Sequence, residues 1–335
     1  LMSTFKEIRG QLIRKYTTDP TTPLEGQIWY NSTSGTLKGY GEGVMSTWAS
    51  GGTYPTPVTN IQSAGTSTAG LAFGGVDTYT PSPNTSSLTS SYNGTSWTAL
   101  AAPANLDTAI NWGCGCGTET SALCFSGNGP TPPAAGSIAS QSWDGSTWTA
   151  TNNMNTYRMA PAGAGTQGAA LCAGGYIPPA SPASSNAAEE FDGTNWSTVN
   201  PINTTRGLVV GGGIQTAAVI YGGYDWGGPG ARNNTEEYDG TNWTSVNNLP
   251  AASEGFGGSG TQTATIAWCP TYAALYDGTN WTNTTSMTSA RGGTTKQIGS
   301  GNIGVALGGD AGPGLVDQTE EYTLVGVTTL TVTTS

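Results

Sequence analysis

The chain has 335 residues and no histidine, which limits the chemistry that its side chains can perform. A Ser-His or Cys-His nucleophile pair is excluded, and so is a metal site built on imidazole ligands. Two carboxylates acting together as acid and base, as in glycoside hydrolysis, remain formally possible. Three adjacent pairs could supply them: Glu189-Glu190, Glu236-Glu237 and Glu320-Glu321.

The position of these pairs favours a structural role over catalysis. Each pair directly precedes an aromatic residue, namely Phe191, Tyr238 or Tyr322, and so occupies the same place in a repeated pattern. A catalytic acid and base need to converge at one site rather than recur along the chain. We therefore expect that the protein is not an enzyme and that it uses neither a cofactor nor a metal.

The repeated pattern is an aromatic residue, Asp or Asn, Gly, two small polar residues and Trp. Asp-Gly and Asn-Gly favour tight turns with positive φ, so each copy predicts a hairpin whose second strand begins at Trp. The carboxylates of these turns are expected to bond their own backbone. The five copies are Tyr92–Trp97, Trp143–Trp148, Phe191–Trp196, Tyr238–Trp243 and Tyr276–Trp281.

A second marker is a short apolar strand that ends, in most copies, in paired glycines. It occurs six times, and its small residues suit strands that crowd around a central axis. Combined with the hairpins, it predicts four antiparallel strands per repeat, which is typical of a β-propeller. The six markers span 65–75, 117–127, 165–175, 213–223, 260–270 and 301–309.

The spacing also predicts how the ring closes. Trp48 precedes the first marker by the same interval as several of the other Trp residues precede theirs, while the last repeat lacks its own Trp strand. We therefore expect residues 46–50 to complete the sixth blade, although Val325–Thr334 is also strongly β-forming and could compete for that place. The predicted division is an N-terminal arm and hairpin at 1–45, followed by a six-bladed propeller at 46–335.

Composition restricts the partners. The net charge is −11, so the body of the chain lacks the basic surface that nucleic-acid binding requires. No apolar run reaches membrane-spanning length, and we expect neither nucleic-acid binding nor membrane insertion. The five cysteines are an odd number, and three of them fall in apolar strand patterns, which favours buried free thiols over a disulfide framework.

Candidate binding residues lie in the loops between the second and third strands of the predicted blades. These loops vary most between repeats and open on one face of a propeller, where recognition usually resides. Their aromatic and polar side chains suit sugar rings or a protein surface. The candidates are Tyr79, Tyr176, Tyr224, Asp225, Trp226 and Arg232.

The repeats resemble kelch repeats. Both have paired glycines, then an aromatic residue and then a Trp, and Arg158, Arg206 and Arg291 stand ahead of the next glycine strand, as a basic residue often does in kelch blades. The interval from Tyr to Trp is shorter here. Kelch-type propellers include copper oxidases that need histidine ligands, and this chain departs from them in having none.

Residues 19–38 resemble a module near the start of tail-fibre and other virion proteins of bacteriophages, especially marine phages. The matching segments are Pro23-Leu24-Glu25-Gly26-Gln27-Ile28-Trp29-Tyr30-Asn31 and Leu37-Lys38. The resemblance implies a docking module that uses Trp29, Tyr30, Asn31, Leu37 and Lys38. It also implies a place on the virion surface, with residues 1–45 bound to other virion proteins.

These expectations combine into one functional hypothesis. The protein is a phage structural protein, a tail fibre or surface decoration, and displays a propeller that binds a host-surface glycan or protein. We expect a homo-oligomer, because multivalent display converts weak contacts into avidity. The alternatives are a stand-alone carbohydrate-binding propeller, that is, a lectin, and a carboxylate-dependent glycosidase.

Overall fold

The computed structural model describes residues 14–21, 27–39, 45–77, 85–129, 137–177, 183–255, 257–293, 298–301, 303–312, 314–325 and 330–332. These residues form strands, turns and loops and contain no helix, so the all-β prediction is confirmed for them. Accordingly, no part of this described chain is a helix long and apolar enough to cross a membrane. The structure divides into two compact units, Trp48–Thr323 and a smaller unit that combines Leu1–Thr47 with Leu324–Ser335.

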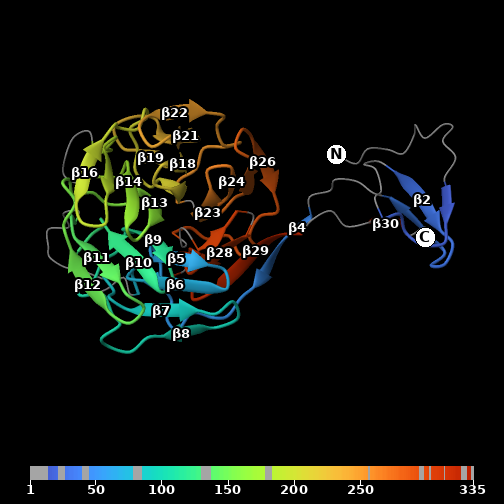
Figure 1. Ribbon diagram of the computed structural model, residues 1–335, viewed down its shortest axis with the longest axis horizontal. Helices are drawn as coiled ribbons and strands as arrows, with labels where there is room; N and C mark the ends of the chain where they lie inside the picture. The colour runs from blue at the N-terminus through green and yellow to red at the C-terminus, as the bar shows by residue number, and fades with distance from the viewer. Residues whose placement is uncertain are drawn as a thin grey trace. The chain divides into compact units, whose positions relative to one another are not determined.

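The larger unit is a ring of six four-stranded antiparallel blades, as predicted. Figure 1 shows the ring with β5, β9, β13 and β23 around its centre and β8, β12, β16, β22 and β26 at its rim. Blades 1 to 3 are β5 (Gln62–Thr66), β6 (Ala69–Phe73), β7 (Thr89–Tyr92), β8 (Trp97–Ala99); β9 (Cys114–Thr118), β10 (Ser121–Phe125), β11 (Ser140–Trp143), β12 (Trp148–Thr151); β13 (Ala162–Thr166), β14 (Ala169–Ala173), β15 (Ala188–Phe191), β16 (Trp196–Val199).

Blades 4 to 6 repeat this arrangement, with one addition in blade 4. There the loop between the second and third strands forms a small hairpin of its own, β19 (Tyr224–Asp225) and β20 (Gly230–Ala231). The blades are β17 (Val210–Ile214), β18 (Ala217–Tyr221), β21 (Thr235–Tyr238), β22 (Trp243–Val246); β23 (Gly257–Thr261), β24 (Ala264–Trp268), β25 (Ala273–Tyr276), β26 (Trp281–Thr284); β27 (Gly299–Ser300), β28 (Ile303–Leu307), β29 (Thr319–Val325) and β4 (Met45–Ser50).

The hairpin turns follow from the Asp-Gly pattern. In blade 4 the Asp239 carboxylate accepts hydrogen bonds from the backbone N–H groups of Thr241 (2.8 Å) and Asn242 (2.7 Å). These bonds stabilise the charged form and lower the pKa of Asp239. The first blade makes the same turn with Asn93, which accepts from the backbone of Thr95 and Ser96 at 2.9 and 2.8 Å.

The strands next to the axis require glycine where their turns begin. Gly165 has a φ of 107°, and an added Cβ would lie 2.1 Å from the backbone oxygen of Ala169. This close approach lets the inner hairpins crowd together around the axis, where a narrow channel of about 110 Å³ remains.

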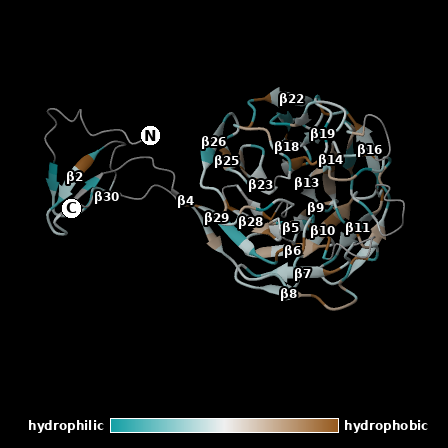
Figure 2. Ribbon diagram, turned by 180° about the vertical axis from the view of Figure 1, so that it is seen from behind, coloured by the Kyte–Doolittle hydropathy of each residue, from teal (hydrophilic) through white to brown (hydrophobic). Residues whose placement is uncertain are grey.

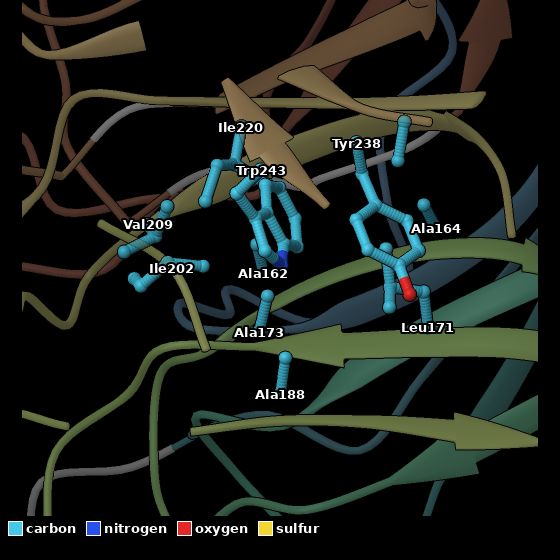
Figure 3. Close-up of a cluster of buried hydrophobic side chains, with 11 residues drawn as sticks. Ala162, Ala164, Leu171, Ala173, Ala188, Ile202, Val209, Ile220, Tyr238 and Trp243 are labelled. Carbon is cyan, nitrogen blue, oxygen red and sulfur yellow. The ribbon is translucent and has the colours of Figure 1, made fainter. Parts of the chain in front are cut away.

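The hydrophobic core consists of clusters between successive blades rather than one central mass. Between blades 3 and 4, Trp243 and Ile220 face small side chains of the preceding blade such as Ala162 and Ala173 (Figure 3). Comparable clusters lie at four other blade interfaces, and Figure 2 shows hydrophobic segments distributed around the whole ring. All five cysteines are buried and none forms a disulfide, which confirms the prediction of buried thiols over a disulfide framework.

The ring closes with β4 as the outer strand of blade 6, which confirms the prediction made for residues 46–50. In Figure 1 this early strand lies beside the late strand β29. The Trp48 indole N–H donates to the backbone oxygen of Thr285 at 2.8 Å. Its ring contacts Trp268 and Tyr322, with centroid distances of 5.5 and 5.3 Å.

The C-terminal tail differs from the predicted division, which assigned everything to residue 335 to the propeller. The two edges of β29 are already occupied by β28 and β4, so the blade offers the tail no place beside it. Instead β30 (Leu330–Val332) pairs with β3 (Thr36–Gly39). The smaller unit is the sheet β1 (Arg14–Tyr16), β2 (Ile28–Asn31), β3 and β30.

Candidate functional site

The first glutamate of each Glu-Glu pair belongs to a buried clamp. Glu189 forms an ion pair with Arg158 at 2.7 Å and accepts hydrogen bonds from the backbone N–H groups of Asn155 (2.7 Å) and Thr156 (3.2 Å). The clamp fixes the connector between two blades to the third strand of the next blade. Glu236 with Arg206, and Glu320 with Arg291, form the same clamp, and the side chains of these three pairs are almost completely buried.

The second glutamate of each pair faces a tyrosine of the following blade. Glu237 accepts a hydrogen bond from the Tyr276 hydroxyl at 2.8 Å, and Glu321 accepts one from Tyr92. Burial and then the neighbouring Glu190 carboxylate raise the pKa of Tyr238, which places Glu190 at the equivalent position. These carboxylates are therefore distributed around the ring and do not converge on one site.

The loop face is the end of the ring where the second strand of each blade ends and the next blade begins. Of the six candidate binding residues, Tyr79 lies outside the described residues. Three of the candidates form an aromatic patch, namely Tyr176 of blade 3 and Tyr224 and Trp226 of blade 4. Trp226 lies between the two tyrosines, with ring centroids 4.5 Å from Tyr176 and 5.1 Å from Tyr224, and it is 42% exposed.

Asp225 and Arg232 support the aromatic patch from within its loop. They form an ion pair at 2.5 Å, and Asp225 also accepts from the backbone N–H of Gly227 at 3.0 Å. Although burial raises the pKa of Asp225, the hydrogen bonds from Arg232 and Gly227 outweigh it, and the net shift is downward. The pair holds the β19–β20 hairpin and thereby fixes Trp226. The backbone N–H of Trp226 also donates to the Ser184 hydroxyl at 2.9 Å.

A pocket of about 420 Å³ lies on the same face, at the mouth of the ring over blades 1, 2 and 6. Its walls come from residues that stand just before the innermost strand or just after the second strand of these blades. They are mostly amides, small residues and one carboxylate. The lining residues are Thr59, Asn60, Val76, Asn111, Trp112, Asn128, Gly292, Gly293 and Asp310.

Reasoning from the sequence missed this pocket because it singled out aromatic and charged residues of the loops, whereas the pocket is lined mainly by amides and small residues at the first loop position and just before the innermost strand. In each of five blades, a residue just before the innermost strand and a residue just after the second strand exchange backbone hydrogen bonds. Aligning the repeats on those positions would have shown the signal, because the second blade alone has asparagine at both. The pairs are Thr59–Val76, Asn111–Asn128, Met159–Tyr176, Gly207–Tyr224 and Gly292–Asp310.

Three of the five predicted docking residues form internal contacts of the small sheet. Trp29, Asn31 and Lys38 all donate to the Asp19 carboxylate, at 3.1, 2.7 and 2.5 Å. The bond from Lys38, followed by those from Asn31 and Trp29, lowers the pKa of Asp19 to about 2. Leu37 pairs with Val332 in the strand register, and Tyr30 is 38% exposed.

Comparisons with known proteins show the fold alone. The chain is similar to YjhT, whose solved structure matches with a TM-score of 0.65 at 14% identity. The match covers 83% of this chain and 99% of YjhT. The shared fold is the propeller. No protein-family model matches the chain, and no curated protein is significantly similar to it in sequence.

What this propeller can do chemically follows from its loop face. The aromatic patch offers a flat apolar surface that a sugar ring or an apolar side chain can cover, held in place by an ion pair. The pocket offers hydrogen-bonding groups with little charge. Within the described residues, no three His, Cys, Asp or Glu side chains gather closely enough to hold a metal ion. The arrangement is suited to binding.

Proposed function

We propose that this protein is a bacteriophage virion component, a tail-fibre or surface-decoration subunit, whose propeller binds the host surface through its loop face. The proposal assigns no catalytic role to the chain. The observation that carries it is the aromatic patch, in which Trp226 is exposed yet held rigidly between Tyr176 and Tyr224. Aromatic residues in fixed positions dominate the binding energy of many interfaces.

The virion location rests on the N-terminal segment. Residues 19–38 resemble a phage virion module, and the kelch-like repeats after it fit the same class of protein. In the structure these residues form a separate small unit, which Asp19 holds together through Trp29, Asn31 and Lys38. We infer that this unit docks on other virion proteins and that Tyr30, exposed on it, contacts them. Several copies per particle would add avidity to weak individual contacts.

Mass spectrometry of purified virions tests the location, and binding of the labelled full-length protein to host cells tests the activity. We expect a stoichiometric virion protein whose cell binding falls about tenfold or more in Trp226→Ala. Ile214→Ala is the matched control, because Ile214 is a 55% exposed apolar residue at the opposite end of the ring. Equal binding by both variants would refute the role of the aromatic patch, and absence from virions would refute the location.

A stand-alone lectin is the main rival, and it would use the same aromatic patch. Virion composition separates the two, because a lectin would bind cells without being part of the particle. A glycosidase is less consistent with the structure, since the Glu pairs are tied to arginines, backbone amides and tyrosines around the ring. Hydrolysis of a host glycan by the purified protein would overturn the non-enzymatic assignment.

A further inference from the structure

The pocket at the mouth of the ring differs from its surroundings in polarity and in shape. Three asparagines, a threonine, an aspartate and Trp112 are among the residues that line a space of about 420 Å³. A space of this size lies in the range of small-molecule sites. Side chains with both donors and acceptors beside an aromatic face suit a ligand rich in hydroxyl groups.

The side-chain oxygens of two asparagines of this pocket lack hydrogen-bond donors. The Oδ1 atoms of Asn111 and Asn128 are buried and accept no hydrogen bond, and Asn111 as a whole is only 3% exposed. An unsatisfied buried acceptor is destabilising, so native structures rarely leave one without a reason. The backbones of the two residues already bond each other, at 3.0 and 2.7 Å, so they cannot supply the missing donors.

Trp112 is held in a strained conformation at the same place. Its φ is 55°, which is unusual for a bulky residue and unfavourable relative to a right-handed conformation. Hydrogen bonds from blade to blade enforce it: the Trp112 N–H donates to Asn60 at 3.3 Å, and the Trp112 carbonyl accepts from Ala160 at 2.6 Å. The backbone that carries the indole is therefore fixed before any ligand arrives, which reduces the entropy lost on binding.

The opposite wall is closely packed at a glycine. An added Cβ on Gly293 would lie 2.4 Å from the Thr59 hydroxyl oxygen and 3.0 Å from the Asn60 side-chain oxygen. A larger residue would therefore displace these two polar side chains, both of which belong to residues that line the pocket. The Asp310 carboxylate stands beside it and accepts the Gly312 N–H at 2.9 Å.

We propose that this pocket binds one neutral sugar ring, with its hydroxyls on Asp310 and the asparagine amides and its apolar face on Trp112. A carboxylate can accept hydrogen bonds from two neighbouring hydroxyls of one sugar. A single carboxylate and no basic group in the lining disfavour an anionic sugar. The inference deepens the proposed function, because the ring would be the terminal unit of a host glycan.

The aromatic patch adjoins this pocket along the mouth. Trp112 is linked to Ala160 by a backbone hydrogen bond, and the preceding residue, Met159, exchanges two with Tyr176. The sugars that follow the terminal unit would therefore reach the patch. The loop face would thus carry a specific pocket for the terminal sugar next to the aromatic patch, a less specific stacking surface.

Saturation-transfer NMR and calorimetry of the full-length protein with methyl glycosides of glucose, galactose, mannose and N-acetylglucosamine test the proposal. We expect millimolar binding of at least one neutral glycoside and weaker binding of the matching uronate. Asp310→Asn and Trp112→Gly should each weaken binding about tenfold or more. Trp112→Gly relieves the φ strain and so is not expected to unfold the ring, and Leu208→Gly at the equivalent position (φ 52°) is its control.

The outcomes separate this inference from the proposed function. If no neutral glycoside binds, or if binding is unchanged in Asp310→Asn and Trp112→Gly, the pocket assignment is wrong even when Trp226→Ala abolishes binding to cells. Saturable binding of Ca²⁺ that displaces the sugar would likewise overturn it in favour of a cation site. If the glycoside binds as expected and the protein neither joins virions nor binds cells, the pocket assignment stands and the proposed function falls.

Discussion

Substituting Trp48 by alanine should weaken the ring specifically at its closure. Trp48 is the residue of β4 that reaches the preceding blade, through its indole hydrogen bond to Thr285 and its contact with Trp268. It also covers Tyr322 within the last blade. Removing the indole takes away these contacts and leaves the pairing of β4 with β29 in place.

The size of the effect can be estimated from these contacts. Truncating a fully buried Trp to alanine costs about 3–5 kcal/mol, and Trp48 is half-buried, so about 2 kcal/mol is expected from packing. The lost hydrogen bond adds about 1 kcal/mol. For a ring of about 280 residues, the entropy of unfolding is about 0.6 kcal/mol per kelvin, so Tm should fall by about 5 °C.

Thermal unfolding and hydrogen exchange measured by mass spectrometry test this estimate together. The amides of β29 should exchange faster in Trp48→Ala, while those of β13 and β14 in blade 3, opposite blade 6, stay protected. Trp243→Ala is the matched control, because it removes the corresponding residue of an internal blade and should accelerate exchange there instead. An unchanged Tm, or equal acceleration around the whole ring, would refute the idea that Trp48 secures the closure.

Three further predictions concern the buried pairs and the turns. Glu236→Gln should destabilise the fold by about 3–5 kcal/mol in chemical denaturation because it leaves Arg206 as an unpaired buried charge, whereas an apolar replacement of both residues should restore much of the loss. Burial raises the pKa of Glu320, but hydrogen bonds from Arg291 and two backbone amides outweigh it and lower the pKa below its ordinary 4.5. The resulting stabilisation is complete above pH 4.5 and is lost as the pH falls through the lower folded value, so Glu320→Gln should flatten the stability profile in that acidic range. Asp239→Asn should leave Tm almost unchanged because an asparagine already makes this turn in the first blade, whereas Asp239→Ala should lower it measurably.

The sequence predicted the ring because its turns and strands are specified locally. The Asp-Gly turn before Trp243 and the glycines near the axis are each required by backbone geometry, and six repetitions determine the blade count. Closure by residues 46–50 followed from the spacing around Trp48. The arginine–glutamate clamps were visible as a repeated structural position, but the pairing of Arg206 with Glu236 became clear only in three dimensions.

The binding pocket could not be predicted in the same way. Asn60, Trp112 and Asp310 are far apart along the chain and meet only because the first, second and sixth blades adjoin at the mouth. Arg232 was expected to face a ligand, yet it is bound to Asp225 within its own loop. The position of the C-terminal tail was also missed, because strand-forming residues indicate a strand but do not identify the edge that receives it.

The pairing of β30 with β3 means that the chain enters the propeller from the small sheet and returns to the same sheet after leaving it. Tension applied through the small unit therefore enters the ring at the start of β4 and at the end of β29 together. These two strands are neighbours in one blade. Just after the end of β4, the Gly51 N–H donates to the backbone oxygen of Thr319, the first residue of β29. A force on one end alone would break the hydrogen bonds of β4 one at a time. A force shared by both ends is resisted by the hydrogen bonds of the whole blade together. A propeller attached in this way is suited to bearing load through both of its chain ends.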